Sequence, residues 1–176
     1  GSQRILKKYF HHSATIMGID INEECLDTDT GTLLRVGSAT DASFLVSVVN
    51  EMGGVDVIID DGSHRSIEQK KAFEILFPLL SLNGVYIVED LEHSYLWRSG
   101  SAPYLPNSFW NYAKRTTELL NNCFRRYPKI GTLKLEPFDL FSISFYPQLV
   151  AFHKIKRGTP RISQVGRQYR ELNQKN

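Results

Sequence analysis

Short apolar runs alternate along this chain with longer segments in which apolar residues recur at helical spacing, and this alternation predicts an α/β fold. The runs that we expect to form strands are Thr15–Asp20, Leu33–Gly37, Val55–Ile59, Val85–Val88, Phe138–Phe145 and Leu149–Ile155. The segments that we expect to form helices are Ser2–Phe10, Ala42–Met52, a stretch that begins at Ser66, and Ser108–Arg126. The last two strands flank the turn Tyr146-Pro147-Gln148, so they should pair as an antiparallel hairpin. The pattern therefore predicts a doubly wound, mostly parallel sheet with an antiparallel edge.

Capping residues mark the ends of two of these helices. Asp41 stands where an N-cap of the helix Ala42–Met52 belongs, and Gly53-Gly54 ends that helix. Ser66 and Gln69 have the spacing of a capping box at the start of the next helix.

The chain is organised around Val55–Tyr95, which reads as strand, helix and strand. The first strand is followed by Asp60-Asp61 and the second by Glu89-Asp90. Both strands of a parallel β-α-β unit point the same way, so their carboxyl ends meet at the edge where open α/β sheets bind ligands. We therefore expect these four carboxylates to converge there with His64, which follows the first strand.

The residue types at this edge suit a hard divalent cation. Asp61, Glu89 and Asp90 offer oxygen ligands without a cysteine partner, a set that favours Mg²⁺ over structural zinc. A bound Mg²⁺ would hold a diol and lower the pKa of one hydroxyl, and His64 would act as the general base. The alternative is that the acids cap helices or pair with Lys and Arg, and that His64 is exposed or itself a cap.

Further candidates surround this group. Asp20 ends the strand Thr15–Asp20 and is placed either to bind the hydroxyls of a ribose or to cap the segment that follows. Tyr95 and Trp97 would either line a pocket wall or belong to the core, and a Gly-, Pro- and Ser-rich loop follows them at Arg98–Asn107. The tail from Lys156 is polar and basic; it is either solvated or binds an anionic partner or another subunit.

Composition narrows the class of protein. A chain of 176 residues with 41% hydrophobic and 23% charged residues is typical of one globular domain, which we place at residues 1–155, followed by the tail 156–176. No apolar run reaches the roughly 18 residues of a membrane span, and no signal peptide is visible, so we expect no membrane partner. Cys25 and Cys123 lie far apart, which favours a reducing, cytoplasmic setting. The net charge of +2 is too small to indicate a nucleic-acid partner by itself.

The motifs IIDDGSH, FEILFPLL and NGVYIVEDLEHSY, preceded by MGIDIN, make the chain similar to a known family. From about Ser2 to Ile155 it resembles the class I S-adenosylmethionine-dependent methyltransferases of the macrolide deoxysugar O-methyltransferase type, such as the mycinamicin and macrocin enzymes. The resemblance implies a Rossmann-like fold and Mg²⁺-dependent methyl transfer from S-adenosyl-L-methionine to a sugar hydroxyl of a glycoside. It also implies a homo-oligomer.

The resemblance assigns a role to individual residues as well. Asp61, Glu89 and Asp90 match the metal ligands of the family, and His64 matches its catalytic base. Asp20 falls where the family binds the ribose of the cofactor, and Gly37, Ser38 and Asp41 fall in the adenine-side loop. We also expect Asp60 to contribute to cofactor binding.

The pattern departs from the family at two places. Ser38 stands where the family often has an acid at the start of the adenine-side loop. The chain begins directly in a helix, without the first strand and glycine-rich turn that we expect between the strands Thr15–Asp20 and Val55–Ile59, so we expect the domain to be incomplete at its N-terminus. These departures favour, as an alternative to a sugar O-methyltransferase, a non-catalytic binding or scaffold protein of this fold. The basic tail motivates a third alternative, a methyltransferase that acts on nucleic acid.

Overall fold

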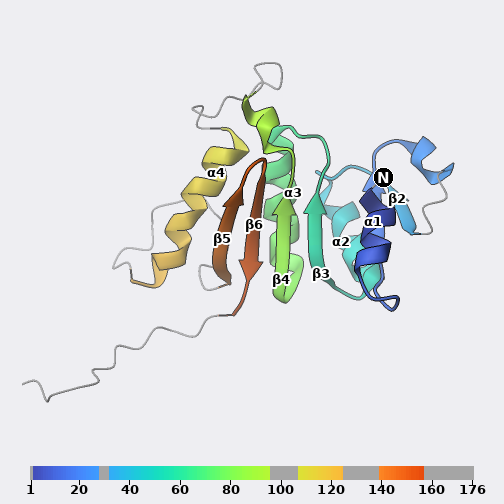
Figure 1. Ribbon diagram of the computed structural model, residues 1–176, viewed down its shortest axis with the longest axis horizontal. Helices are drawn as coiled ribbons and strands as arrows, with labels where there is room; N and C mark the ends of the chain where they lie inside the picture. Colours follow the sequence, from blue (N-terminus) through green and yellow to red (C-terminus); the bar gives the residue numbers. More distant parts are fainter. Residues whose placement is uncertain (1, 28–31, 96–106, 125–138, 157–176) are drawn as a thin grey trace, which may run out of the picture.

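The computed structural model of the protein describes residues 2–27, 32–95, 107–124 and 139–156 (Figure 1). Four strands form one sheet in the order β3, β4, β6, β5. β3 (Val55–Asp60) and β4 (Leu80–Val88) run parallel, whereas β6 (Leu149–Lys154) is antiparallel to both β4 and β5 (Leu140–Tyr146). The predicted hairpin of the last two strands is thus confirmed, with Gln148 in the left-handed region at its turn (φ 64°).

Two further strands form a separate parallel pair. β1 (Met17–Asp20) pairs with β2 (Leu33–Val36), and within the described ranges β1 is not joined to β3 by a ladder of hydrogen bonds. Figure 1 shows this pair beside the β3 edge of the larger sheet. The strand that we expect between β1 and β3 is not among the described residues.

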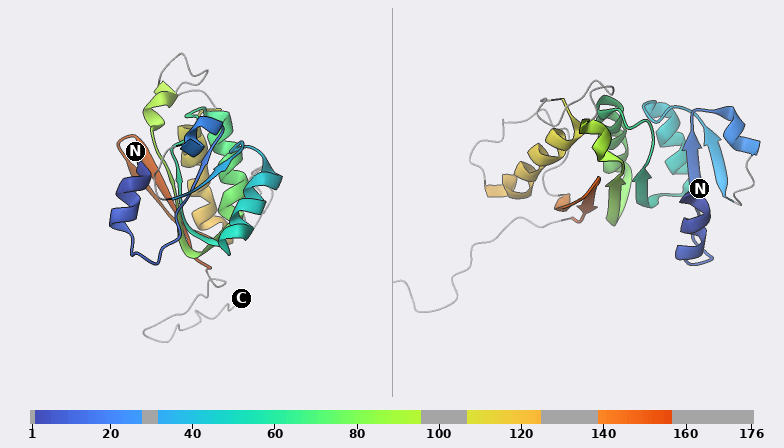
Figure 2. Two further views of the ribbon diagram at one scale, coloured as in Figure 1. Left: turned by 90° about the vertical axis from the view of Figure 1, so that its right-hand side faces the viewer. Right: turned by 45° about the horizontal axis from the view of Figure 1, so that its top comes forward.

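Helices cover the larger sheet on one face. α2 (Ala42–Met52), α3 (Ser66–Leu79) and α4 (Phe109–Thr116) lie on that face, and α1 (Ser2–Tyr9) lies on the opposite side (Figure 2). Short 3₁₀ helices follow β1 (η1, Glu23–Asp27), β4 (η2, Leu91–Tyr95) and α4 (η4, Thr117–Phe124). None of the helices in the described part is long and apolar enough to cross a membrane.

The core lies between the sheet and the helices α3 and α4, with Phe73 at its centre. Phe73 is fully buried, and its ring contacts Tyr86 of β4 and Phe152 of β6 at centroid distances of 5.0 and 4.4 Å. It also meets Phe109 and Tyr112 of α4 edge to face, at 6.2 and 5.9 Å. Edge-to-face pairs of this kind add to the gain from burying the rings, so this cluster holds α3 and α4 on the sheet.

A buried lysine fixes the end of α3. Lys154 of β6 is 5% exposed, and its Nζ donates hydrogen bonds to the carbonyls of Phe77, Pro78 and Leu80 at 3.3, 2.7 and 2.8 Å. The last carbonyls of a helix have no partner within it, and a cation is favoured there by the helix dipole. Burial lowers the pKa of the Lys154 ammonium.

The caps were predicted correctly at α2 and wrongly at α3. The Asp41 carboxylate accepts hydrogen bonds from the amides of Ser43 and Phe44, and Gly53 ends α2 in the left-handed conformation (φ 75°). At α3 the N-cap residue is Arg65, whose side chain makes no capping hydrogen bond. The predicted capping box is absent: Ser66 Oγ and Gln69 Oε1 have no hydrogen-bond partner among the described residues, and the side-chain Nε2 of Gln69 donates to the carbonyl of Glu89 at 3.4 Å.

The helix predicted at Ser108–Arg126 is shorter than expected. Ser108 caps it, but α4 ends at Thr116 and continues as the 3₁₀ helix η4, while residues 125 and 126 lie outside the described ranges. The hydroxyls of Thr116 and Thr117 donate to the carbonyls three residues earlier, at 2.7 and 2.6 Å. Such bonds compete with the α-helical pattern and favour the tighter turn.

Candidate active site

The carboxyl ends of β3 and β4 lie side by side. In the parallel register Asp60 pairs with Val88, so Asp61 and Glu89 each follow the last paired residue of their strand. The amide of Glu89 donates to the carbonyl of Asp60 at 3.0 Å. The structure therefore places the acidic residues of both strand ends at one edge of the sheet.

His64 and Asp90 face each other across this edge. Both have left-handed backbone conformations, with φ of 54° and 53°, in which non-glycine residues are uncommon. Nε2 of His64 lies 3.7 Å from an Oδ of Asp90, and the His64 ring stacks on that of His93 at a centroid distance of 4.7 Å. Nδ1 of His64 is buried and has no hydrogen-bond partner among the described residues. Strained backbone at two facing residues is typical of functional sites.

The side chain of Asp60 points into the protein, unlike that of Asp61. One oxygen of its carboxylate accepts a hydrogen bond from the hydroxyl of Tyr86 at 3.2 Å, and the other accepts the amide of Gly62 at 3.3 Å. Burial raises the pKa of Asp60, and these two hydrogen bonds oppose the rise. Asp61, by contrast, is exposed to solvent.

The electrostatics of the edge suit a cation. Partial burial raises the pKa of Glu89, and the nearby charges of Asp61 and Asp90 raise it further. Carboxylates that destabilise one another in this way become favourable when a cation lies between them. Ligand atoms of His64, Asp90 and His93 also lie within 4.8 Å of one another, close enough to share one ion. The donors present thus fit a divalent cation, although Asp61 and Glu89 are not part of that three-residue group.

A second group of predicted residues lies at the ends of β1 and β2. The amide of Gly37 donates to the carbonyl of Asp20 at 2.8 Å, which joins the loop after β2 to the end of β1. The Asp20 carboxylate accepts the amide of Asn22, which lowers the pKa of Asp20, as does a hydrogen bond from the thiol of Cys25. The hydroxyl of Ser38 pairs with that of Thr40 at 2.9 Å.

Asp41, the last residue of this second group, caps α2. A side-chain hydrogen bond from Ser43 and the amide of Phe44 lower the pKa of Asp41. The cofactor-binding roles of Asp20, Gly37, Ser38, Asp41 and Asp60 stay predictions.

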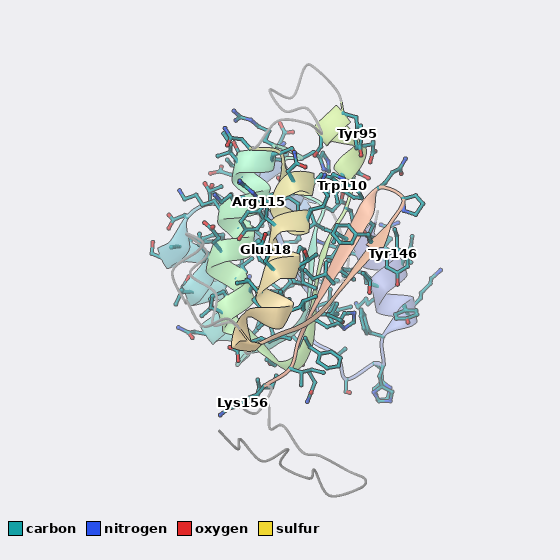
Figure 3. The ribbon with its side chains drawn as sticks, turned by 90° about the vertical axis from the view of Figure 1, so that its left-hand side faces the viewer. Tyr95, Trp110, Arg115, Glu118, Tyr146 and Lys156 are labelled. Atoms are coloured by element: carbon teal, nitrogen blue, oxygen red, sulfur yellow. The ribbon has the colours of Figure 1, made fainter. Side chains whose placement is uncertain are left out.

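The predicted pocket residues are only partly described. Tyr95 ends η2 and is 56% exposed, and Figure 3 shows it beyond Trp110, at the opposite end of this face from Lys156. Tyr95 is therefore a surface residue and not part of the core. Trp97 and most of the Arg98–Asn107 loop lie outside the described residues.

Two residues near this edge, His93 and Tyr86, were not predicted from the sequence. His93 follows Asp90 at the spacing with which His64 follows Asp61, so the repeated Asp-x-x-His pattern is a signal that marks it. Tyr86 reads only as a buried position of β4, and nothing in the pattern indicates where its hydroxyl points.

The fold is similar to that of solved methyltransferase structures. The structure superimposes on the MycE methyltransferase of the mycinamycin biosynthetic pathway, solved in complex with Mg, SAH and mycinamycin VI, with a TM-score of 0.77 over 88% of this chain and 40% of MycE. The identity over this match is 22%, so the likeness establishes the fold. The predicted Rossmann-like class I methyltransferase fold, with parallel strands and an antiparallel C-terminal hairpin, is confirmed.

Curated relatives of the chain are named as sugar O-methyltransferases. The chain is 31% identical over 158 residues to the 8-demethyl-8-alpha-L-rhamnosyl tetracenomycin-C 2'-O-methyltransferase of Streptomyces olivaceus, a match that covers 88% of the chain and 41% of the relative. It is 33% identical over 95 residues to the mycinamicin VI 2''-O-methyltransferase of Micromonospora griseorubida, covering 54% of the chain and 24% of the relative. No protein-family profile matches the sequence.

These matches confirm the resemblance to the deoxysugar O-methyltransferases. The chain spans less than half the length of the curated relatives that it matches.

Proposed function

We propose that this chain belongs to an S-adenosylmethionine-dependent O-methyltransferase that requires a divalent cation and methylates a hydroxyl of a glycosidic sugar. The observation that carries this proposal is the geometry of one sheet edge, where Asp61 and Glu89 follow paired residues of adjacent parallel strands and His64 lies 3.7 Å from Asp90. The similarity to enzymes named for methyl transfer to sugar hydroxyls supports it.

Asp61, Glu89 and Asp90 would hold the cation. The raised pKa of Glu89, caused by burial and by its two acidic neighbours, indicates carboxylates that gain stability from a shared positive charge. A bound Mg²⁺ supplies a Lewis acid that orients two neighbouring hydroxyls of the acceptor and makes one of them more acidic.

His64 would accept the proton of that hydroxyl at Nε2, the nitrogen next to Asp90. It would do so while the acceptor oxygen forms its bond to the methyl carbon and the sulfonium sulfur keeps the electrons of the bond that breaks. The Asp90 carboxylate would stabilise the imidazolium that results. General bases of this kind contribute about 10²- to 10⁴-fold to the rate.

Asp20 and the loop after β2 would bind the nucleoside part of S-adenosyl-L-methionine. Asp20 ends a strand at the position where doubly wound folds bind ribose hydroxyls, and the hydrogen bond from Gly37 holds the loop with Ser38 and Asp41 next to it. Asp60, at the end of β3, would support this site.

The acceptor would be a small glycoside that approaches over η2. Tyr95 is exposed there, and we propose that it contacts the acceptor together with Trp97. The cytoplasmic location and the homo-oligomer predicted from the sequence remain part of this proposal.

The experiment is methyl transfer from radiolabelled S-adenosylmethionine to a rhamnoside by the purified protein. We expect turnover that EDTA abolishes and added Mg²⁺ restores. In His64→Ala we expect turnover to fall by about 10²-fold or more while Mg²⁺ binding persists. The matched control is His153→Ala, because His153 of β6 pairs with Val85 and so lies away from the carboxyl ends of β3 and β4. Turnover that survives both EDTA and His64→Ala would refute the proposal, and binding without turnover of any sugar would favour the non-catalytic alternative.

A further inference from the structure

The side chain and backbone of Asp60 receive hydrogen bonds from three different segments. Its carboxylate accepts the hydroxyl of Tyr86, from within β4, and the amide of Gly62, in the turn after β3. Its carbonyl accepts the amide of Glu89, the first residue after β4. Asp60 therefore ties together the turn after β3, the interior of β4 and the residue that follows β4.

Asp61 lies between Asp60 and Gly62, two residues that are joined by a hydrogen bond. Asp60 precedes it and Gly62 follows it, and the hydrogen bond between them closes the backbone around Asp61. The Tyr86 hydroxyl fixes the carboxylate that makes this bond. A shift of the Asp60 carboxylate would move Asp61 relative to Glu89 and Asp90, the other two carboxylates of the proposed cation site.

We infer that Tyr86 is a positioning residue of the proposed cation site, acting through Asp60 to hold Asp61 in reach of the carboxylates that follow β4. This inference rests on the proposed function for the identity of the site. Tyr86 does not touch the cation or the substrates in this scheme, because its side chain is fully buried.

The hydroxyl, and not the ring, carries this role. The Tyr86 ring packs edge to face on Phe73 at 5.0 Å, a contact that phenylalanine would make equally well. A buried tyrosine hydroxyl is costly unless it has a partner. Here the partner is the residue that precedes Asp61, which links the core of the protein to the site.

Tyr112 offers a matched control. Its ring also meets Phe73 edge to face, at 5.9 Å, and it is 7% exposed. Its hydroxyl donates to a carboxylate as well, that of Glu74 at 3.4 Å, but Glu74 lies on α3 and not at the strand ends. Tyr86→Phe and Tyr112→Phe therefore remove the same atom from similar surroundings.

The first test is the binding of Mn²⁺ to the chain, followed by electron paramagnetic resonance. Supporting residues around metal ligands typically change metal affinity about 10- to 100-fold when they are lost. We expect the Kd for Mn²⁺ to rise about tenfold or more in Tyr86→Phe and to stay within about threefold of wild type in Tyr112→Phe. Equal Mn²⁺ affinity of Tyr86→Phe and wild type would overturn the inference.

A second test does not depend on metal binding. We expect the amides of Gly62 and Glu89 to exchange with deuterium about tenfold faster in Tyr86→Phe than in Tyr112→Phe, because Asp60 loses one of its anchors only in the former. Equal exchange in the two variants would overturn the inference whatever the metal result. Absence of Mn²⁺ binding in wild type, with faster exchange in Tyr86→Phe, would refute the proposed cation site and leave the link from Tyr86 to Asp60 standing.

Discussion

Replacement of Lys154 by methionine tests how the protein fixes α3 on the sheet. Methionine keeps most of the apolar stem of the side chain but removes the ammonium and its three hydrogen bonds, to the carbonyls of Phe77, Pro78 and Leu80. The carbonyl of Phe77 also receives the backbone amide of Leu80, so Pro78 and Leu80 lose the most.

The expected change in the free energy of unfolding follows from these hydrogen bonds. A buried polar group left without its partner costs about 1–3 kcal/mol, so two such carbonyls give about 2–6 kcal/mol. The variant has no buried ammonium, so the free-energy cost of desolvating that charge disappears and offsets part of this loss. We expect the free energy of unfolding to fall by about 2–4 kcal/mol.

Urea unfolding followed by circular dichroism measures this change. Lys70→Met is the control: Lys70 lies on the surface of α3, 3.9 Å from Glu74, and the loss of such an exposed ion pair changes stability by less than about 1 kcal/mol. A loss of less than about 1 kcal/mol in Lys154→Met would show that the helix end does not depend on the buried cation, and it would refute the reasoning.

Two further predictions concern Asp61 and Asp41. Asp61→Asn should raise the Kd for Mg²⁺ by about tenfold or more in calorimetry, whereas Asp56→Asn, an exposed change on β3, should not; equal effects would remove Asp61 from the site. Asp41→Ala should lower the urea midpoint at pH 7, while Asp41→Asn should retain the cap. Because the capping hydrogen bonds hold the pKa of Asp41 below its ordinary 3.8, its carboxylate stabilises the fold above pH 3.8 and this contribution is lost as the pH falls through the lowered pKa. A difference between wild type and Asp41→Ala that is equally large well below that pKa would contradict this assignment.

Local sequence signals were sufficient to predict most elements of the fold. The strands β3 and β6 are apolar runs bounded by turn or polar residues, and α2 begins and ends where Asp41 and Gly53 indicate. The start of α3 could not be predicted in the same way. Gln69 has a long-range partner, the carbonyl of Glu89, that a capping box does not anticipate. Likewise, the separation of β1 and β2 from the larger sheet depends on pairing between distant segments.

The candidate site, too, could be predicted only in part from the sequence. The order of strand, acids and histidine predicts that Asp61, His64 and Asp90 share an edge, because the carboxyl ends of parallel strands meet. The pattern could not predict that Asp60, identical in type to Asp61, turns inward toward Tyr86. Side-chain direction at a strand end depends on the turn that follows, and period-2 alternation ends before that turn.

The central claim is that a cation at the ends of β3 and β4 and S-adenosylmethionine at the end of β1 form one site. Calorimetric titration of the protein with S-adenosylmethionine, with and without Mg²⁺, tests this claim directly. We predict that the cofactor binds and that the protein has a Mg²⁺ site that Asp61→Asn weakens. Absence of cofactor binding would contradict the claim and favour a non-catalytic protein of methyltransferase-like fold.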